Sequence, residues 1–218
     1  MEDKIKGAYK HSKIIYDDVL TQNKWWSKLY IRLFWGVDDS AITQKLLKMI
    51  PDDFVGSLLD VPCGTLNLTV DKYRNMQQCR ITCLDYSEDM LAMAKARMAK
   101  YSLFNVSAIQ GDVGDLPFVH STFDIVLSMN GFHAFLNKER EFSEVARVMK
   151  NNGIFLGCFY IKGENRRSDF IVNTVLAKKG WFTPPFQTKS DVFATLSKYY
   201  AKVELFSDEA MVWFKCIK

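Results

Sequence analysis

Three aspartates of this sequence, Asp60, Asp85 and Asp112, each follow a short apolar segment that is typical of a buried strand. Asp85 at such a position could accept hydrogen bonds from ribose hydroxyls. The turn 62–65 follows the first strand, and a helix is predicted over 66–75. A strand, a turn and a helix in this order form half of a nucleotide-binding unit. The backbone N–H groups of the turn and the helix N-terminus could together bind a small anionic group.

The same turn has two other interpretations. It could be an ordinary strand-to-helix connection that binds no ligand. It could also belong to an NAD site, because Asp85 lies 21 residues after Gly64, which suits a ribose contact. The dinucleotide fingerprint, however, needs glycines for close approach of the pyrophosphate, and two of them are missing here.

His133 is the histidine nearest the expected site, in the segment Asn130-Gly131-Phe132-His133. Its ordinary pKa suits a general base at neutral pH, and a structural or orienting histidine is the alternative. Cys63, inside the turn, is expected to be a small buried residue rather than a nucleophile.

Alternating strands and helices are expected to position these residues. Short apolar runs predict strands over residues 57–61, 80–84, 106–110, 123–129 and 153–160. Helical patterns predict helices over 40–49, 66–75, 87–100 and 138–150. This alternation predicts an α/β fold with a doubly wound, parallel sheet. Further helices are expected over 163–180 and 188–199, and a closing hairpin over 202–206 and 210–217.

Composition favours an ordinary globular protein. The 218 residues carry a net charge of +4, with an acidic middle third between two basic flanks. No run of like charges indicates a nucleic-acid partner, and no apolar run is long enough to span a membrane. The first residues lack the apolar core of a signal peptide, and the five cysteines lack a metal-binding spacing, so we expect a cytoplasmic protein with reduced thiols and no metal site. Its oligomeric state is left open.

Five segments occur in a characteristic order between about residues 14 and 160. They are Asp-Val-Pro-Cys-Gly-Thr (60–65), Asp-Tyr-Ser-Glu-Asp-Met-Leu (85–91), Gly-Asp-Val-Gly-Asp-Leu-Pro-Phe (111–118), Phe-Asp-Ile-Val-Leu-Ser (123–128) and Glu-Val-Ala-Arg-Val-Met-Lys-Asn-Asn-Gly (144–153). Together they resemble the class I S-adenosylmethionine-dependent methyltransferases, within them the group that contains the ubiquinone and menaquinone biosynthesis enzymes. The resemblance implies a seven-stranded, mostly parallel sheet of the Rossmann-like methyltransferase type, closed by the antiparallel hairpin.

The resemblance also implies a role for each matching position. S-adenosylmethionine would be the cofactor, its methionine end held by Asp60, Val61, Pro62, Cys63, Gly64 and Thr65. Asp85 would bind the ribose, and Tyr86, Ser87, Met90, Gly111, Asp112 and Val113 would surround the adenine side. Met129, Asn130 and Gly131 would line the methyl-transfer channel, with His133 as the candidate base, and Tyr16 would contact the cofactor from an amino-terminal cap.

One position departs from the family. The family turn is typically Asp-x-Gly-x-Gly-x-Gly, and only its middle glycine, Gly64, is present. Leu66 takes the place of the third glycine, and we expect it in the first turn of the following helix with its side chain toward the sheet. A single domain is expected, with a helical cap (1–50), a cofactor-binding core (55–160), a helical substrate cap (161–200) and the closing hairpin (201–218).

The implied activity is methyl transfer to a small, apolar or aromatic acceptor by direct in-line displacement. The segment 128–131 is not of the Asn/Asp-Pro-Pro-Tyr type that resembles nucleic-acid amino methyltransferases. Two alternatives remain: a catalytically silent relative that acts as a binding or regulatory protein, and an NAD-dependent oxidoreductase.

Overall fold

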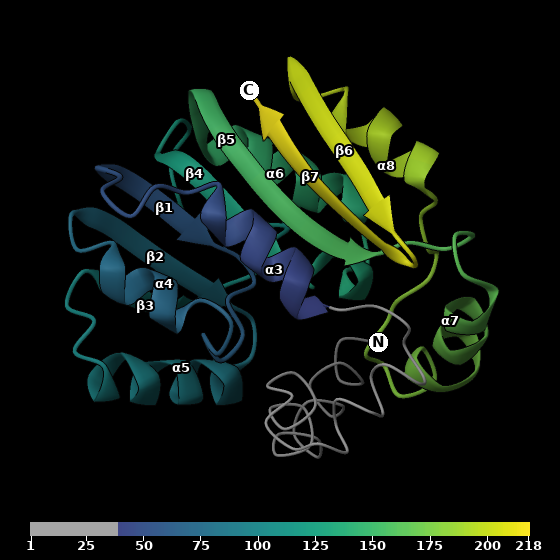
Figure 1. Cartoon of the computed structure of the whole chain (residues 1–218), viewed down its shortest axis with the longest axis horizontal. Helices are drawn as coiled ribbons and strands as arrows, with labels where there is room; N and C mark the ends of the chain where they lie inside the picture. Colours follow the sequence, from purple (N-terminus) through teal and green to yellow (C-terminus); the bar gives the residue numbers. More distant parts are fainter. Residues whose placement is uncertain (1–38) are drawn as a thin grey trace.

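The computed structural model describes residues 39–218, and Tyr16 and most of the helical cap predicted over 1–50 lie outside this range. Seven strands of the described range form one sheet in the order β3-β2-β1-β4-β5-β7-β6 (Figure 1). They are β1 (Gly56–Asp60), β2 (Cys79–Asp85), β3 (Val106–Gln110), β4 (Phe123–Met129), β5 (Met149–Tyr160), β6 (Lys202–Asp208) and β7 (Met211–Ile217). The first five pair in parallel, and β7 pairs antiparallel with both β5 and β6. The predicted α/β fold with its closing hairpin is confirmed.

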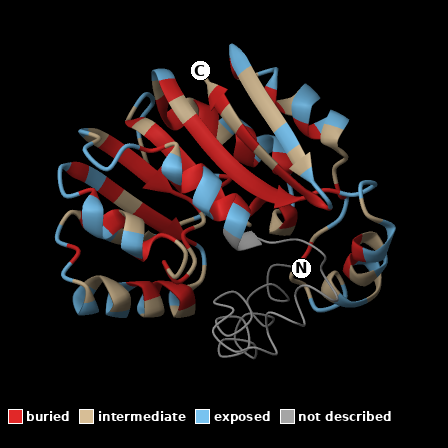
Figure 2. Cartoon of the chain, viewed as in Figure 1, coloured by how far each residue is buried: buried red, intermediate tan, exposed pale blue. Residues whose placement is uncertain are grey.

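Helices cover both faces of the sheet because successive residues of its strands point to opposite sides. Leu58 packs with α3 (Asp39–Lys48), α4 (Val70–Asn75) and α5 (Glu88–Lys100). The next residue, Leu59, packs on the other face with α6 (Lys138–Val148) and α8 (Lys189–Leu196). Figure 2 shows the buried strands between these two layers.

Side-chain caps fix the starts of the helices that lead away from the site. The Ser87 hydroxyl accepts a hydrogen bond from the Met90 N–H at the start of α5, at 3.3 Å. Asn137 caps α6 in the same way, through the N–H of Arg140 at 3.2 Å. Such caps satisfy N–H groups that have no partner inside the helix, so α5 and α6 begin where the polar residues occur.

Several predicted boundaries are wrong. Met149 is extended and pairs with Phe123, so α6 ends at Val148 and β5 begins before the predicted strand. The helix predicted over 163–180 is divided into α7 (Arg166–Ile171) and a π-helix over Val172–Leu176.

The predicted substrate cap also differs from the structure in one part. Val192 and Leu196 of α8 are fully buried in the core beside α6. The second predicted helix of that cap therefore belongs to a layer of the fold that covers the sheet. None of the described helices combines the length and the apolar composition that a membrane crossing requires.

Leu66 adopts an unusual backbone conformation. Its φ is +60°, in the left-handed region, and α4 begins only at Val70, so the prediction that Leu66 lies in the first turn of that helix is wrong. Its side chain is only 1% exposed and packs in the core with Leu58 and Tyr73. A glycine in this place would adopt the positive φ without strain, whereas leucine pays roughly 1–2 kcal/mol for it and gains a buried side chain.

This conformation predicts an unusual order of stability for two variants. Leu66→Ala removes the buried side chain but keeps the strain, and should lower the free energy of unfolding by about 2–5 kcal/mol. Leu66→Gly makes a cavity of similar size and relieves the strain, so it should be more stable than Leu66→Ala by about 1 kcal/mol. Chemical denaturation of the two variants measures the difference.

Ala94, buried in the middle of α5, is the control. There Ala94→Gly should reduce stability by about 1 kcal/mol, the usual preference for alanine in a helix. If Leu66→Ala proved more stable than Leu66→Gly, the left-handed conformation would not be that of the folded protein.

Candidate functional site

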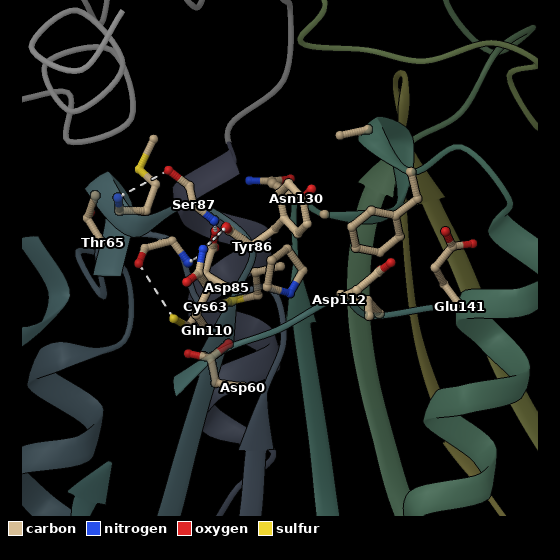
Figure 3. Close-up of a pocket in the computed structure, with 18 of the residues that line it drawn as sticks. Asp60, Cys63, Thr65, Asp85, Tyr86, Ser87, Gln110, Asp112, Asn130 and Glu141 are labelled. Carbon is tan, nitrogen blue, oxygen red and sulfur yellow. Dashed lines mark hydrogen bonds between the residues drawn. The ribbon is translucent and has the colours of Figure 1, made fainter. Parts of the chain in front are cut away.

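A pocket of about 620 Å³ lies at the carboxyl ends of β1, β2 and β4 and beside the loop that follows β3. Fourteen of the residues expected from the sequence to bind a cofactor line it (Figure 3). They are Asp60, Pro62, Cys63, Gly64, Thr65, Asp85, Tyr86, Ser87, Met90, Asp112, Val113, Met129, Asn130 and Gly131. Val61 and Gly111 belong to the same segments but are not among the lining residues.

The carboxylate of Asp85 joins two of these segments. One of its oxygens, Oδ2, accepts a hydrogen bond from the Gly64 N–H at 2.8 Å, and Oδ1 accepts one from the Ser87 N–H at 2.9 Å. Asp85 is only 8% exposed, and this burial raises the pKa of its carboxyl group, although the hydrogen bonds from backbone N–H groups lower it. The turn after β1 is therefore held against the start of α5 by a single buried carboxylate.

Several backbone N–H groups in and beside the turn after β1 already have partners within the protein. The N–H groups of Val61, Cys63, Gly64 and Leu66 all donate to oxygens within the protein. The N-terminus of the following helix does not adjoin the turn 62–65, because α4 begins only at Val70. At this end the pocket is lined by the carboxylates of Asp60 and Asp85, at the ends of β1 and β2, and these favour cations and hydroxyl groups.

Asp60 lies at the end of β1 and is 1% exposed. Its Oδ2 accepts hydrogen bonds from the Tyr73 hydroxyl at 2.8 Å and from the Thr69 hydroxyl at 3.5 Å. Burial raises the pKa of this carboxyl group to about 7, and the nearby Asp85 adds to the rise. Two buried carboxylates thus lie at adjacent strand ends, and a positive charge between them would favour their ionised forms.

The end of β4 forms the next wall of the pocket. Asn130 has a positive φ of 54° and donates its N–H to the carbonyl of Cys158 at 2.8 Å. A Cβ atom on Gly131 would lie 2.3 Å from the Cδ atom of Pro62, so no larger residue fits at this position. The absence of a side chain there lets the turn after β1 pack closely against the end of β4.

His133 is not among the residues that line this pocket. Its ring stacks on Phe182, with 3.9 Å between ring centroids, and burial together with the positive charge of Lys138 lowers its pKa to about 3. Such an imidazole is neutral across the physiological range and too weakly basic to accept a proton efficiently. The role of general base for His133 therefore stays a prediction, and the geometry gives it no support.

The start of α6 contributes lining residues that sequence reasoning missed. Asn137, Arg140 and Glu141 line the pocket, while Phe142 of the same helix is buried in the core. Residues at positions i, i+3 and i+4 share one helix face, so the predicted start of α6 close to the end of β4 was the signal that could have revealed them. Asn67, Leu68, Thr69, Glu88, Asp89, Gln110, Gly114, Ala134, Phe135 and Leu136 complete the lining.

A buried lysine fixes the loop between β4 and α6. The Nζ atom of Lys138 donates to the carbonyls of Phe135 and Thr183, at 2.8 and 2.9 Å. Burial lowers its pKa to about 8, although the neighbouring Glu141 opposes this shift. The contact joins the aromatic segment 181–186 to this loop. No residue of that segment lines the pocket, and Phe182 and Phe186 are buried in the core.

Comparison with known proteins agrees with this geometry. Residues 58–153 match a family model described as a methyltransferase domain. The demethylmenaquinone methyltransferase of Leptospira interrogans is 32% identical over 117 residues, which cover 51% of this chain and 46% of that enzyme. The chain thus spans about half the length of the curated relatives that it matches.

Solved structures share the fold over most of the chain. The YcgJ protein of Bacillus subtilis matches with a TM-score of 0.66 and 18% identity, covering 82% of this chain and 98% of that one. An S-adenosylmethionine-dependent methyltransferase of Aquifex aeolicus matches with a TM-score of 0.61 and 17% identity, covering 83% and 98%. Residues 58–153 are thus similar to a methyltransferase domain, and the strand order and the solved structures show that the chain has the fold of these proteins.

Proposed function

We propose that the protein transfers the methyl group of S-adenosylmethionine to a small, apolar or aromatic acceptor. The observation that carries this proposal is the pair of buried carboxylates, Asp60 and Asp85, at adjacent strand ends in one pocket. S-adenosylmethionine has two positive charges, on its sulfonium and its α-ammonium, and a ribose with two hydroxyl groups. The two carboxylates suit both kinds of group.

Each segment of the pocket has a proposed part in binding. Asp60 and the turn 62–65 hold the methionine end, with the carboxylate facing the ammonium. Asp85 keeps further lone pairs on both oxygens after it accepts the two backbone N–H groups, and these accept hydrogen bonds from the ribose hydroxyls. Tyr86, Met90, Asp112 and Val113 surround the adenine side, since they line the same pocket beyond Asp85.

The chemistry proposed for the site makes few demands on acid–base groups. Methyl transfer from a sulfonium is a direct displacement with a neutral leaving group. The protein has to align the acceptor with the methyl–sulfur bond and exclude water. Met129, Asn130 and Gly131 are the proposed walls of this channel, because they lie between the cofactor end of the pocket and the start of α6.

The acceptor is proposed to be small and at least partly apolar. Ala134, Phe135 and Leu136 line the pocket at the start of α6, which gives the acceptor an apolar surface. The relative from Leptospira interrogans is named for methylation of demethylmenaquinone, an aromatic acceptor. A quinone-like or other aromatic ring suits such a surface.

The position of Leu66 argues against a catalytically silent protein. A leucine in place of the family's third glycine would impair cofactor binding if its side chain entered the pocket. The side chain is buried in the core and is not among the residues that line the pocket. A direct measurement of binding and of methyl transfer distinguishes the two functions.

Replacement of Asp85 tests the cofactor site. Asp85→Asn should weaken the affinity for S-adenosylmethionine and S-adenosylhomocysteine at least tenfold, because it removes a charge-assisted acceptor for the ribose hydroxyls. Titration calorimetry measures both affinities, and NAD serves as a third ligand that should give no heat.

Asp71→Asn is the matched control, since Asp71 is an exposed aspartate on α4 outside the pocket. Its affinity should equal that of the unaltered protein. Equal affinities for Asp85→Asn would exclude Asp85 from the site. Heat with NAD and none with S-adenosylhomocysteine would favour an oxidoreductase, and binding without methyl transfer to any acceptor would favour a silent module.

Asp60→Asn should stabilise the protein while it impairs binding. Burial raises the pKa of Asp60 to about 7, so the folded state holds this proton more tightly than the unfolded state does. The free energy of unfolding therefore falls as the pH rises from about 4 to about 7, and stays lowered at higher pH. The asparagine has no such proton to lose.

The melting temperature of Asp60→Asn should accordingly exceed that of the unaltered protein by a margin that grows from pH 5 to pH 7. The affinity for S-adenosylmethionine at pH 8 should fall at least tenfold, because the positive charge of the ligand loses its partner. Thermal denaturation across pH and calorimetry measure the two effects. A margin that did not change with pH would show that Asp60 is ionised freely in the folded protein.

A further inference from the structure

The pocket is acidic along its whole length. Among the described lining residues, six carry carboxylates and a single one, Arg140, carries a positive charge. The six are Asp60, Asp85, Glu88, Asp89, Asp112 and Glu141. The bound cofactor would offset part of this charge at the end near β1 and β2. An acceptor with a phosphate or carboxylate group would meet repulsion, whereas a cationic or uncharged acceptor would not.

Glu141 is the acidic residue that the cofactor contacts proposed above do not use. It lies on α6, is 7% exposed, and lines the pocket at the far end from Asp60 (Figure 3). Its Oε1 accepts the N–H of Asn137 at 3.4 Å. Its Oε2 is buried and has no hydrogen-bond partner among the residues that the structure describes. A buried carboxylate oxygen without a donor is costly, unless a ligand supplies that donor.

The charged groups around Glu141 do not supply the donor that its Oε2 lacks. Burial is the largest cause that raises the pKa of the Glu141 carboxyl group, and the charge of Asp112, from the loop after β3, raises it further. Lys138 acts in the opposite direction, but its Nζ already donates to the carbonyls of Phe135 and Thr183. Arg140 lines the pocket with its Nε near Gly114, and no ion pair joins it to Glu141 in the described part of the chain.

A second unpartnered group lies along the same pocket. The side-chain nitrogen of Asn130, Nδ2, is buried at the end of β4 and has no partner among the described residues. Phe135, in the loop that precedes α6, lines the same pocket. The acceptor end of the pocket therefore offers one carboxylate oxygen, one amide group and an aromatic ring.

We propose that the methyl acceptor is a small, basic amine that carries an aromatic ring, and that Glu141 binds its reacting nitrogen and accepts a proton from it. This inference rests on the proposed methyl transfer and names its substrate class. A carboxylate in an acidic pocket selects a basic nitrogen over a phosphate or a carboxylate, and the apolar wall accommodates the ring.

The proposed step balances without a further reactant. The bound amine is protonated, and its ammonium nitrogen gives one proton to the Glu141 carboxylate, which frees the lone pair on nitrogen. This lone pair forms the new bond to the methyl carbon, and the electrons of the carbon–sulfur bond stay on sulfur. The products are the methylated ammonium ion, protonated Glu141 and S-adenosylhomocysteine with a neutral thioether.

Binding of two probes to the protein saturated with S-adenosylhomocysteine tests the inference. The probes are 2-phenylethylamine and 2-phenylethanol, which share a ring and differ in the terminal group. Calorimetry should give at least tenfold tighter binding of the amine. Glu141→Gln should abolish this preference, while its Oε1 still accepts the Asn137 N–H and preserves the start of α6.

Glu139→Gln is the matched control, because Glu139 is an exposed neighbour on α6 that pairs with Lys198 outside the pocket. It should keep the preference for the amine. Binding of neither probe, equal binding of both, or an unchanged preference in Glu141→Gln would overturn the inference. So would weaker binding of S-adenosylhomocysteine by Glu141→Gln, since that would assign Glu141 to the cofactor. A protein that bound no S-adenosylhomocysteine at all would instead refute the proposed function.

Discussion

The hydrogen bonds of the Asp85 carboxylate set the shape of the pocket. This group accepts the N–H of Gly64 from one turn and the N–H of Ser87 from another, and both bonds are short. Ser87 in turn caps α5 through the N–H of Met90. The turn after β1, the end of β2 and the start of α5 are thus fixed by one connected set of contacts. A buried carboxylate needs such donors, so the arrangement follows from the burial of a charge at a strand end.

Burial of this charge, and of the charges on Asp60 and Glu141, conflicts with stability. Burial raises the pKa of all three carboxyl groups, which means that the folded protein disfavours their ionised forms. The two apolar layers on either side of the sheet supply the stability that tolerates this cost. Residues that destabilise a fold by their burial are typical of binding sites, because a ligand of opposite charge removes the penalty.

The sequence is sufficient to predict the sheet and the aspartates at its edge. Short apolar runs mark the strands, and residues that end parallel strands lie at the same edge of the sheet, so Asp60 and Asp85 could be placed together without coordinates. The hydrogen bonds of the turn could not be predicted, because they depend on which neighbouring carbonyl each N–H reaches. The backbone of Leu66 could not be predicted for a related reason. Its side chain packs in the core, as expected, but its φ is positive and it lies before α4 rather than in the first turn of that helix.

The segment between β4 and α6 shows why the type of a residue alone does not identify a catalytic group. His133 has the chemistry of a base, but it belongs to a short 3-10 helix over Phe132–Ala134 in which both Phe132 and His133 are buried. Eight residues later the chain is in α6, and its period places Glu141 on the face that lines the pocket. The histidine loses basicity because burial disfavours its cation, and the glutamate gains basicity because burial disfavours its anion. Burial therefore makes Glu141 a stronger base than His133.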